Sequence, residues 1–364
     1  MVTAMQDARV TGSQDPSARP VAWHVGRQGE VAGGMTQVVN GYLAWPFETM
    51  DVRVITSRDG SEGPRAWLLL LRAVLSVLRL KNTSQNMLVV HLSQGGSFVR
   101  EGLLLLLGRM RGFGTAAHIH GSSFVEFASR HPWVVGRVLR AANKVIVLSA
   151  AAQKAVERFV APGSVELVPN AVPEGQAVEK ERLVVFGGGV THRKGVDVLV
   201  EAWRRVGAGR GWQLAIAGPI IDKHLVPDSL ADAEFLGAVP HRRLMELLDR
   251  ASIAVLPSRD EAMPMFILEA MARDNCVIST KVGGIPAVLG EGRGILVDAA
   301  NADQLAQALD TAMSDDSVRK HVAATGRRAF NQSYSARAIY PRVERLWAGV
   351  IRDAAASGTS EARQ

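Results

Sequence analysis

Residues 251–271 read ASIAVLPSRDEAMPMFILEAM and carry the clearest structural pattern of the chain. The apolar run 251–257 predicts a strand inside a parallel sheet, because Ile, Val and Leu side chains suit burial on both faces. Residues 258–263 are polar or small and predict a loop. Pro264 fits the first turn of a helix, where its missing N–H costs nothing. The pattern therefore predicts a strand, a loop and a helix in succession.

Two carboxylates lie on either side of the predicted helix start. Glu261 falls in the loop at the carboxyl end of the strand, and Glu269 lies about a turn and a half into the helix. The free N–H groups of a helix start suit an anion such as a phosphate. One glutamate is then placed to hold a sugar hydroxyl and the other a ribose. This arrangement predicts a site for a nucleotide sugar.

The same alternation of strands and helices extends along most of the chain. Strands are expected at 21–25, 52–56, 87–92, 115–120 and 145–149, then at 183–186, 213–217, 233–235, 253–256, 276–280 and 295–297. Helices are expected at 35–42, 67–80, 99–110 and 150–159, then at 196–206, 241–251, 263–273, 302–313 and near 335–356. Such alternation predicts two Rossmann-like parallel sheets covered by helices, with a ligand cleft between their carboxyl ends.

Composition limits the cellular setting. The 364 residues, 47% of them hydrophobic, suffice for two ordinary domains. The single cysteine, Cys276, falls in a predicted buried strand and has no partner for an internal disulfide, which favours a cytoplasmic location. The N-terminus shows no apolar core with a cleavage site, so no signal peptide is expected. Residues 1–20 are polar and predict a mobile tail.

Basic charge is concentrated in the first half of the chain. Residues 51–150 contain 13 Lys and Arg against 5 acids, whereas the net charge of the whole chain is +7. Within 65–81, arginines recur every seven positions at Arg65, Arg72 and Arg79, which places them along one face of the predicted helix. The run is too short and too charged to span a bilayer.

Two interpretations of this helix remain open: a packed helix with a solvated basic face, or a face that rests on anionic lipid, where each basic residue adds about 1 kcal/mol. The residues that would extend such a patch are Arg109, Arg111, Arg137, Arg140 and Lys144. No base-reading motif or interleaved aromatic pattern accompanies the charge, so nucleic acid is not an expected partner.

The spacing of Glu261 and Glu269 is similar to the E-x7-E signature of retaining glycosyltransferases with the GT-B fold, especially glycosyltransferase family 4. Further motifs that resemble the family are GGMTQVV at 33–39, HIHG at 118–121, VIVLS at 145–149, VPNAV at 168–172, RKG at 193–195 followed by Asp197 and Leu199, and GGIP at 283–286. They occur in the family's order and cover roughly residues 21–347.

The resemblance implies an α/β, GT-B architecture. An N-terminal Rossmann-like acceptor-side domain is expected at 21–168, and a C-terminal nucleotide-sugar-binding domain at 169–335. A helix in 336–364 is expected to cross back onto the first domain.

The resemblance also assigns roles to individual residues. Glu261 is expected near the reacting carbon, Lys194 beside the donor phosphates and His120 in the active site. Residues two positions apart on a strand point to the same face of the sheet, so His118 stays an alternative to His120. The other residues expected to bind the donor are Gly33, Gly34, Asn170, Arg193, Met265, Phe266 and Glu269.

The chain departs from the family pattern at three places. Gly189 stands where an arginine is often found, so that Arg193, His192 or backbone N–H groups would have to supply the second phosphate contact. Ala262-Met263 replaces a frequent Gly-Phe, and Ala171 replaces a glycine. No Asp-x-Asp follows a strand and no His/Cys cluster has ligand spacing, so no metal site is expected.

The function implied is retaining transfer of a sugar from a nucleotide-diphosphate donor, a UDP-sugar above all, to a polar or lipid-linked glycan acceptor. This activity belongs to polysaccharide biosynthesis and needs no cofactor besides the donor. The expected location is cytoplasmic, with peripheral membrane contact through 65–81. Two alternatives stay open: a GT-B-like nucleotide-sugar epimerase, and a catalytically inactive protein that binds a glycan or another transferase.

Overall fold

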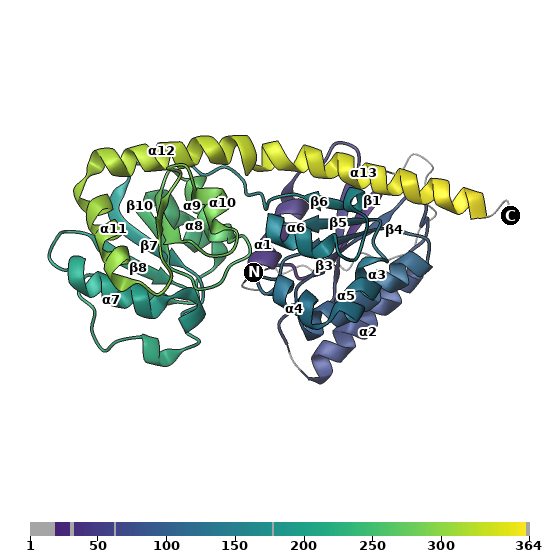
Figure 1. Ribbon diagram of the computed structural model, residues 1–364, viewed down its shortest axis with the longest axis horizontal. Coiled ribbons are helices and arrows are strands. Elements are labelled where there is room, and N and C mark those ends of the chain that lie inside the picture. The colour runs from purple at the N-terminus through teal and green to yellow at the C-terminus, as the bar shows by residue number, and fades with distance from the viewer. Residues whose placement is uncertain (1–18, 30–32, 62, 177, 362–364) are drawn as a thin grey trace, which may run out of the picture.

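The computed structural model describes residues 19–29, 33–61, 63–176 and 178–361, so most of the predicted N-terminal tail lies outside it. The chain forms two six-stranded parallel sheets, each with helices packed against it (Figure 1). Long apolar runs explain the strands: every residue of β3, β4 and β10 is buried. The expected α/β architecture of two Rossmann-like units is therefore confirmed.

The first sheet has the strand order β2-β1-β3-β4-β5-β6, and each neighbouring pair is parallel. Its strands are β1 (Val21–Gly26), β2 (Asp51–Thr56), β3 (Met87–Leu92), β4 (Gly114–Ile119), β5 (Lys144–Val147) and β6 (Val165–Leu167). Its helices are α1 (Gly34–Ala44), α2 (Pro64–Arg79), α3 (Gly96–Met110), α4 (Phe124–Arg130), α5 (Pro132–Leu139) and α6 (Ala150–Val156), followed by the short turn η1 (Pro162–Ser164).

The second sheet has the order β12-β11-β10-β7-β8-β9. Its strands are β7 (Glu181–Gly187), β8 (Gln213–Ala217), β9 (Ala233–Gly237), β10 (Ala251–Leu256), β11 (Cys276–Thr280) and β12 (Ile295–Val297). The helical elements around it are η2 (His192–Lys194), α7 (Val196–Val206), η3 (Lys223–Leu225), α8 (His241–Arg250), α9 (Met265–Met271), α10 (Ile285–Leu289), α11 (Ala302–Ser314) and α12 (Asp316–Ser333).

The last helix returns to the first sheet. Helix α13 (Ala336–Glu361) follows α12 along one side of the molecule and packs on β3 and β4 (Figure 1). Trp347 of α13 is fully buried and its ring lies 5.0 Å from that of His24 on β1. The predicted crossing back of the C-terminal helix is confirmed.

Several elements differ from the prediction. The crossing between domains was expected to begin at 166–168, but Val165–Leu167 form β6 and pair with β5. Helices α4, α5, α10 and α12 were not predicted. Gly326 lies inside α12 and obscures the helical pattern in the sequence. The close packing explains this glycine, because a Cβ at this position would come within 2.8 Å of the Arg293 carbonyl oxygen. Within the described residues, none of the helices combines the length and apolar character that a membrane span requires.

Candidate active site

The loops at the carboxyl ends of the two sheets meet. Ser122, just beyond β4, donates a hydrogen bond to the carboxylate of Asp260, just beyond β10. Gly34 at the start of α1 faces Met265 at the start of α9, and a Cβ on Gly34 would lie 3.5 Å from Met265 Cγ. These contacts bring the predicted first-domain and second-domain site residues to a common region, as expected for parallel sheets that bind ligands at their carboxyl edges.

Lys194 and Glu261 form the centre of this region. The Lys194 ammonium donates to Glu261 Oε1, and Ser258 Oγ donates to the same oxygen at 2.8 Å. The side chains are only 17% and 8% exposed, so the charges are shielded from water and interact strongly. Lys194 ends η2, where Thr191 Oγ1 accepts from the Lys194 N–H. The sequence predicted both charged residues but not Ser258.

Glu269, the second predicted glutamate, is buried on α9 and faces a residue that the sequence did not single out. Its Oε1 lies 2.8 Å from Nε2 of His241, the first residue of α8. Glu269 is 4% exposed, whereas the His241 side chain is 41% exposed. No motif marks His241, because the contact arises from packing of α8 against α9 across 28 positions.

Helix α9 is shorter than predicted. It runs over seven residues from Met265, with Pro264 as its N-cap, instead of over 263–273. Met265 and Phe266 are buried, and Phe266 packs so closely on Gly187 that a Cβ there would lie 2.4 Å from its ring. Because so short a helix has a weak dipole, the cationic side chains matter more for anion binding here than the helix start.

A second charged pair supports the lysine loop. Arg259 donates two hydrogen bonds to Asp197, at 2.7 and 2.6 Å, and its backbone N–H donates to the Arg193 carbonyl oxygen. Burial alone would raise the pKa of Asp197, but the hydrogen bonds and charge of Arg259 hold it below its usual value. Arg193 is exposed and donates to the Asp260 carbonyl oxygen at 2.9 Å. The η2 loop is thereby tied to the loop after β10.

The glycine turn after β7 supplies fewer amides than the sequence suggested. The N–H groups of Gly188 and Val190 donate to the carbonyl oxygens of Ala217 and Pro219, so two of the three amides of residues 188–190 are already bonded. Gly189 faces Ile221, whose Cδ1 would be 3.2 Å from an added Cβ. Arg193 therefore stays the better candidate for the second phosphate contact.

The predicted first-domain and linker residues also lie near α9. Asn170 Nδ2 donates to the Met263 carbonyl oxygen at 3.1 Å, next to the N-cap of α9. Gly33 has φ 140°, and no described atom lies within 4 Å of the position that its Cβ would take. That open space leaves the backbone accessible to a ligand.

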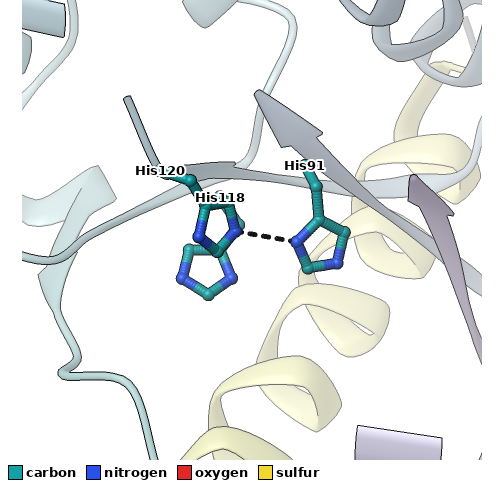
Figure 2. Close-up of side chains that lie close together, drawn as sticks. All are labelled: His91, His118 and His120. Carbon is teal, nitrogen blue, oxygen red and sulfur yellow. Dashed lines mark hydrogen bonds between the residues drawn. The ribbon is translucent and has the colours of Figure 1, made fainter. Parts of the chain in front are cut away.

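The two candidate histidines differ in environment. His118 is 1% exposed in the core, and His120 is partly exposed at the carboxyl end of β4, two residues before Ser122. Geometry therefore favours His120 as the residue that meets a substrate. Figure 2 shows His118 and His120 beside His91 of β3, with a hydrogen bond of 2.8 Å between His91 Nδ1 and His120 Nε2.

The expectation that no histidine cluster has ligand spacing needs correction. A nitrogen from each of His91, His118 and His120 lies within 4.8 Å of the others. The cluster has no local sequence signal, because His91 is 27 positions from His118 and only the pairing of β3 with β4 makes them Cα partners.

Comparisons with known proteins find similarity to glycosyltransferases. Residues 169–329 match the family described as Glycosyl transferases group 1. The chain is 28% identical over 164 residues to an uncharacterized glycosyltransferase of Methanocaldococcus jannaschii, covering 43% of this chain and 42% of that protein. It is 30% identical over 242 residues to an alpha-maltose-1-phosphate synthase of Mycobacterium tuberculosis, covering 56% of this chain and 62% of that protein. The matches thus span about two fifths to three fifths of the length of these relatives.

Two solved structures share the fold over nearly their whole length. Sucrose-phosphate synthase from Thermosynechococcus elongatus has a TM-score of 0.69 at 19% identity and covers 91% of this chain and 99% of its own. HepE from Anabaena, in complex with UDP and glucose, has a TM-score of 0.68 at 14% identity, and the match covers 90% of this chain and 99% of HepE. These likenesses confirm the expected GT-B fold.

Proposed function

We propose that this chain, whose residues 169–329 match the family described as Glycosyl transferases group 1, is a retaining glycosyltransferase that uses a nucleotide-diphosphate sugar. The observation that carries the proposal is the shielded Lys194–Glu261 pair, held by Ser258 where the carboxyl ends of both sheets meet. An ammonium and a carboxylate in such a place suit a reaction in which a diphosphate departs while the anomeric carbon gains positive charge.

Each side chain has a distinct part in the proposed reaction. The bond between the anomeric carbon and the diphosphate oxygen breaks, a bond to the acceptor oxygen forms, and the acceptor proton passes to the departing diphosphate. Lys194 and Arg193 stabilise the leaving diphosphate, Glu261 holds the donor sugar and Glu269 the ribose hydroxyls. His120 positions the acceptor. No covalent nucleophile or metal is assigned to the transfer.

A UDP-sugar is the proposed donor. HepE, which shares the fold, has been solved in complex with UDP and glucose. The buried oxygen pair of Glu269 supplies two acceptors for ribose hydroxyls in any nucleotide, so this residue does not select the base.

A lipid-linked glycan is the proposed acceptor, because an apolar groove opens at the carboxyl edge of the first sheet. The groove, of about 990 Å³, lies between α2, α3 and α5. Its apolar wall includes Trp67, Leu70, Val99, Leu103, Leu106, Trp133 and Val138. Arg27, Arg100 and Arg137 line the same groove and suit the phosphate of an anionic lipid.

The outer face of α2 supports peripheral contact with an anionic membrane. Leu70, Ala73 and Val77 are buried against the domain, whereas Leu71, Leu75 and Leu78 are 54%, 37% and 42% exposed beside the arginine row. A merely solvated basic face does not require exposed leucines. Leucines next to arginines instead match a helix that lies at a lipid surface.

The test is incubation of the protein with UDP-sugars, with and without vesicles that carry a polyprenyl diphosphate-linked sugar. Transfer to the lipid with retained anomeric configuration supports the proposal. Conversion of the donor into its epimer without acceptor would favour the epimerase alternative. If thermal unfolding does not respond to any nucleoside diphosphate, the inactive partner alternative gains support instead.

A further inference from the structure

Four histidines converge in the core of the first domain, and the proposed transfer uses only His120 among them. His24 on β1, His91 on β3 and His118 on β4 are at most 1% exposed, and His120 follows β4. His91 Nε2 lies 2.8 Å from His24 Nδ1, and His91 Nδ1 lies 2.8 Å from His120 Nε2. The ring centroids of His118 and His120 are 4.0 Å apart.

His118 is the member that ordinary packing does not explain. Both of its ring nitrogens are buried and neither has a hydrogen-bond partner among the described groups. Buried polar atoms without partners are rare in native proteins and costly, so they require a specific explanation. An apolar residue of the same size would fill this position at lower cost.

The imidazoles are in the state that a metal ion needs. Burial lowers the pKa of His118 to about 3, and burial with the neighbouring histidines holds the pKa of His91 and His120 well below the usual range. All three rings are therefore neutral at pH 7 and present lone pairs. Neutral imidazole is a ligand for Zn²⁺, Cu²⁺, Ni²⁺ and Fe²⁺.

We propose that His91, His118 and His120 bind a divalent transition metal ion, zinc in the first instance, through one ring nitrogen each (Figure 2). Three ligand atoms within 4.8 Å of one another need only small side-chain shifts to reach the Zn–N distances of about 2.0–2.1 Å. Three protein ligands leave a fourth tetrahedral position for water. His120 is partly exposed and provides the side from which an ion enters.

Binding requires no net loss of protons. The ion takes the place of the hydrogen between His91 Nδ1 and His120 Nε2, and that proton moves to His120 Nδ1. This balance uses the tautomer in which His91 carries its proton on Nε2 and donates it to His24 Nδ1, 2.8 Å away. His24 then fixes the orientation of a ligating ring, as partners in the outer shell of metal sites do.

A positive charge near the site has a carboxylate partner. Arg58 is close enough to influence His91 and His120, and its Nε lies 3.6 Å from Oε1 of the fully buried Glu101. The carboxylate reduces the repulsion that the guanidinium would exert on a bound cation. The ion would join the end of β3 to the loop that carries His120 and Ser122, so its role is to position that loop and not to take part in transfer.

The experiment uses the untagged full chain, stripped with a chelator and titrated with zinc against a chromophoric chelator. We expect one zinc per chain, a melting temperature that rises with zinc concentration, and visible absorption typical of four-coordinate Co²⁺ when cobalt replaces zinc. His118→Leu should lower zinc affinity by roughly 100-fold or more, because losing a ligand exceeds the loss of an outer-shell partner. His321→Ala, which removes an exposed histidine on α12, should change nothing.

His24→Leu separates ligands from their support. It should weaken zinc binding by roughly 10- to 100-fold while leaving the cobalt spectrum four-coordinate. If His118→Leu does not fold, His120→Asn serves as the ligand variant, since His120 lies outside the strand. Equal zinc affinity in wild type and in the folded ligand variant, or no binding by wild type, would overturn the proposal. None of these readings depends on transferase activity.

Discussion

Gly283 lies directly against the carbonyl oxygen of Glu261, so that a Cβ at position 283 would be only 1.6 Å from that oxygen. Gly283 has φ +53°, a conformation that favours glycine. The following Gly284 meets the Ala262 carbonyl oxygen in the same way, at 2.1 Å from an added Cβ. The glycine turn after β11 therefore sets the path of the loop that carries Glu261.

Gly283→Ala should abolish most transfer activity, because the loop must move and carries Glu261 away from Lys194. Gly292→Ala is the matched control: its φ is +76°, but no described atom lies within 4 Å of an added Cβ. Both variants should lose about 1 kcal/mol of stability from the left-handed backbone. Steady-state kinetics and thermal unfolding separate the two effects, and equal activity in both variants would contradict the assigned role.

Lys194→Ala and Glu261→Gln should each lower kcat/KM by roughly 10²–10³-fold, the usual effect of removing one electrostatic contact to a transition state. Lys320→Ala, which breaks an exposed ion pair with Asp316, is the control for loss of a lysine and should be fully active. Circular dichroism checks that the variants fold. Near-normal turnover in either site variant would remove the basis for the proposed mechanism.

Glu269→Gln should act mainly on donor affinity. The substitution weakens the contact with the ribose and the hydrogen bond to His241, while the reacting centre stays intact. A hydrogen bond to a charged group is worth about 1.5–3 kcal/mol, so the Kd for UDP should rise about tenfold or more. Calorimetric titration with UDP measures this, with Glu246→Gln on the exposed face of α8 as the control. A change confined to kcat would argue against ribose binding.

Much of this architecture could be predicted from local patterns. The bounds of β3, β8, β11 and β12 agree with the expected ranges, because continuous apolar runs between turn residues identify buried parallel strands. The glutamates, Lys194 and the glycine turn are adjacent to such strands, and strand ends define the site. Helices α4 and α5 were missed because each is short and His131-Pro132 interrupts the helical pattern.

Contacts that depend on packing between distant segments could not be predicted. The pairs His241–Glu269 and Ser122–Asp260 join residues 28 and 138 positions apart, and no local signal links them. The histidine cluster likewise needs the register of β3 against β4. In α2 the arginine row was found, but the exposure of Leu71 follows from which face packs on α3, and periodicity alone does not reveal that.

Leu71→Ser combined with Trp67→Ser should weaken membrane association. Both side chains are exposed, at 54% and 72%, so their removal costs the fold little while it takes away apolar contact with lipid. Flotation with vesicles of phosphatidylglycerol should retain the wild type and release the variant, and neutral phosphatidylcholine should retain neither. Ile221→Ser, which removes a side chain that is 63% exposed on the second domain, should bind like the wild type. Retention of the double variant on anionic vesicles would exclude α2 as the lipid-binding face.

Acid should destabilise the metal-free protein through its buried histidines. Burial lowers the pKa of His24 and His118 to about 3, against an unfolded value near 6.5. Between these values the unfolded chain binds more protons than the folded chain, so the free energy of unfolding falls as pH falls below 6.5. At pH 5 the loss should be about 2 kcal/mol for each of the two residues.

Urea unfolding at pH 7 and pH 5, with a chelator present, measures this loss. His118→Leu should reduce this loss by about 2 kcal/mol, its own share, and His321→Leu, at an exposed position, should leave it unchanged. The carboxyl groups of Asp197 and Glu344, whose pKa values are also lowered, lose their charge only in more acidic solution, so the interval from pH 5 to 6.5 reports the histidines. A stability that is flat over this interval would mean that the imidazoles are solvated, and the core cluster would then have to be more open than its burial indicates.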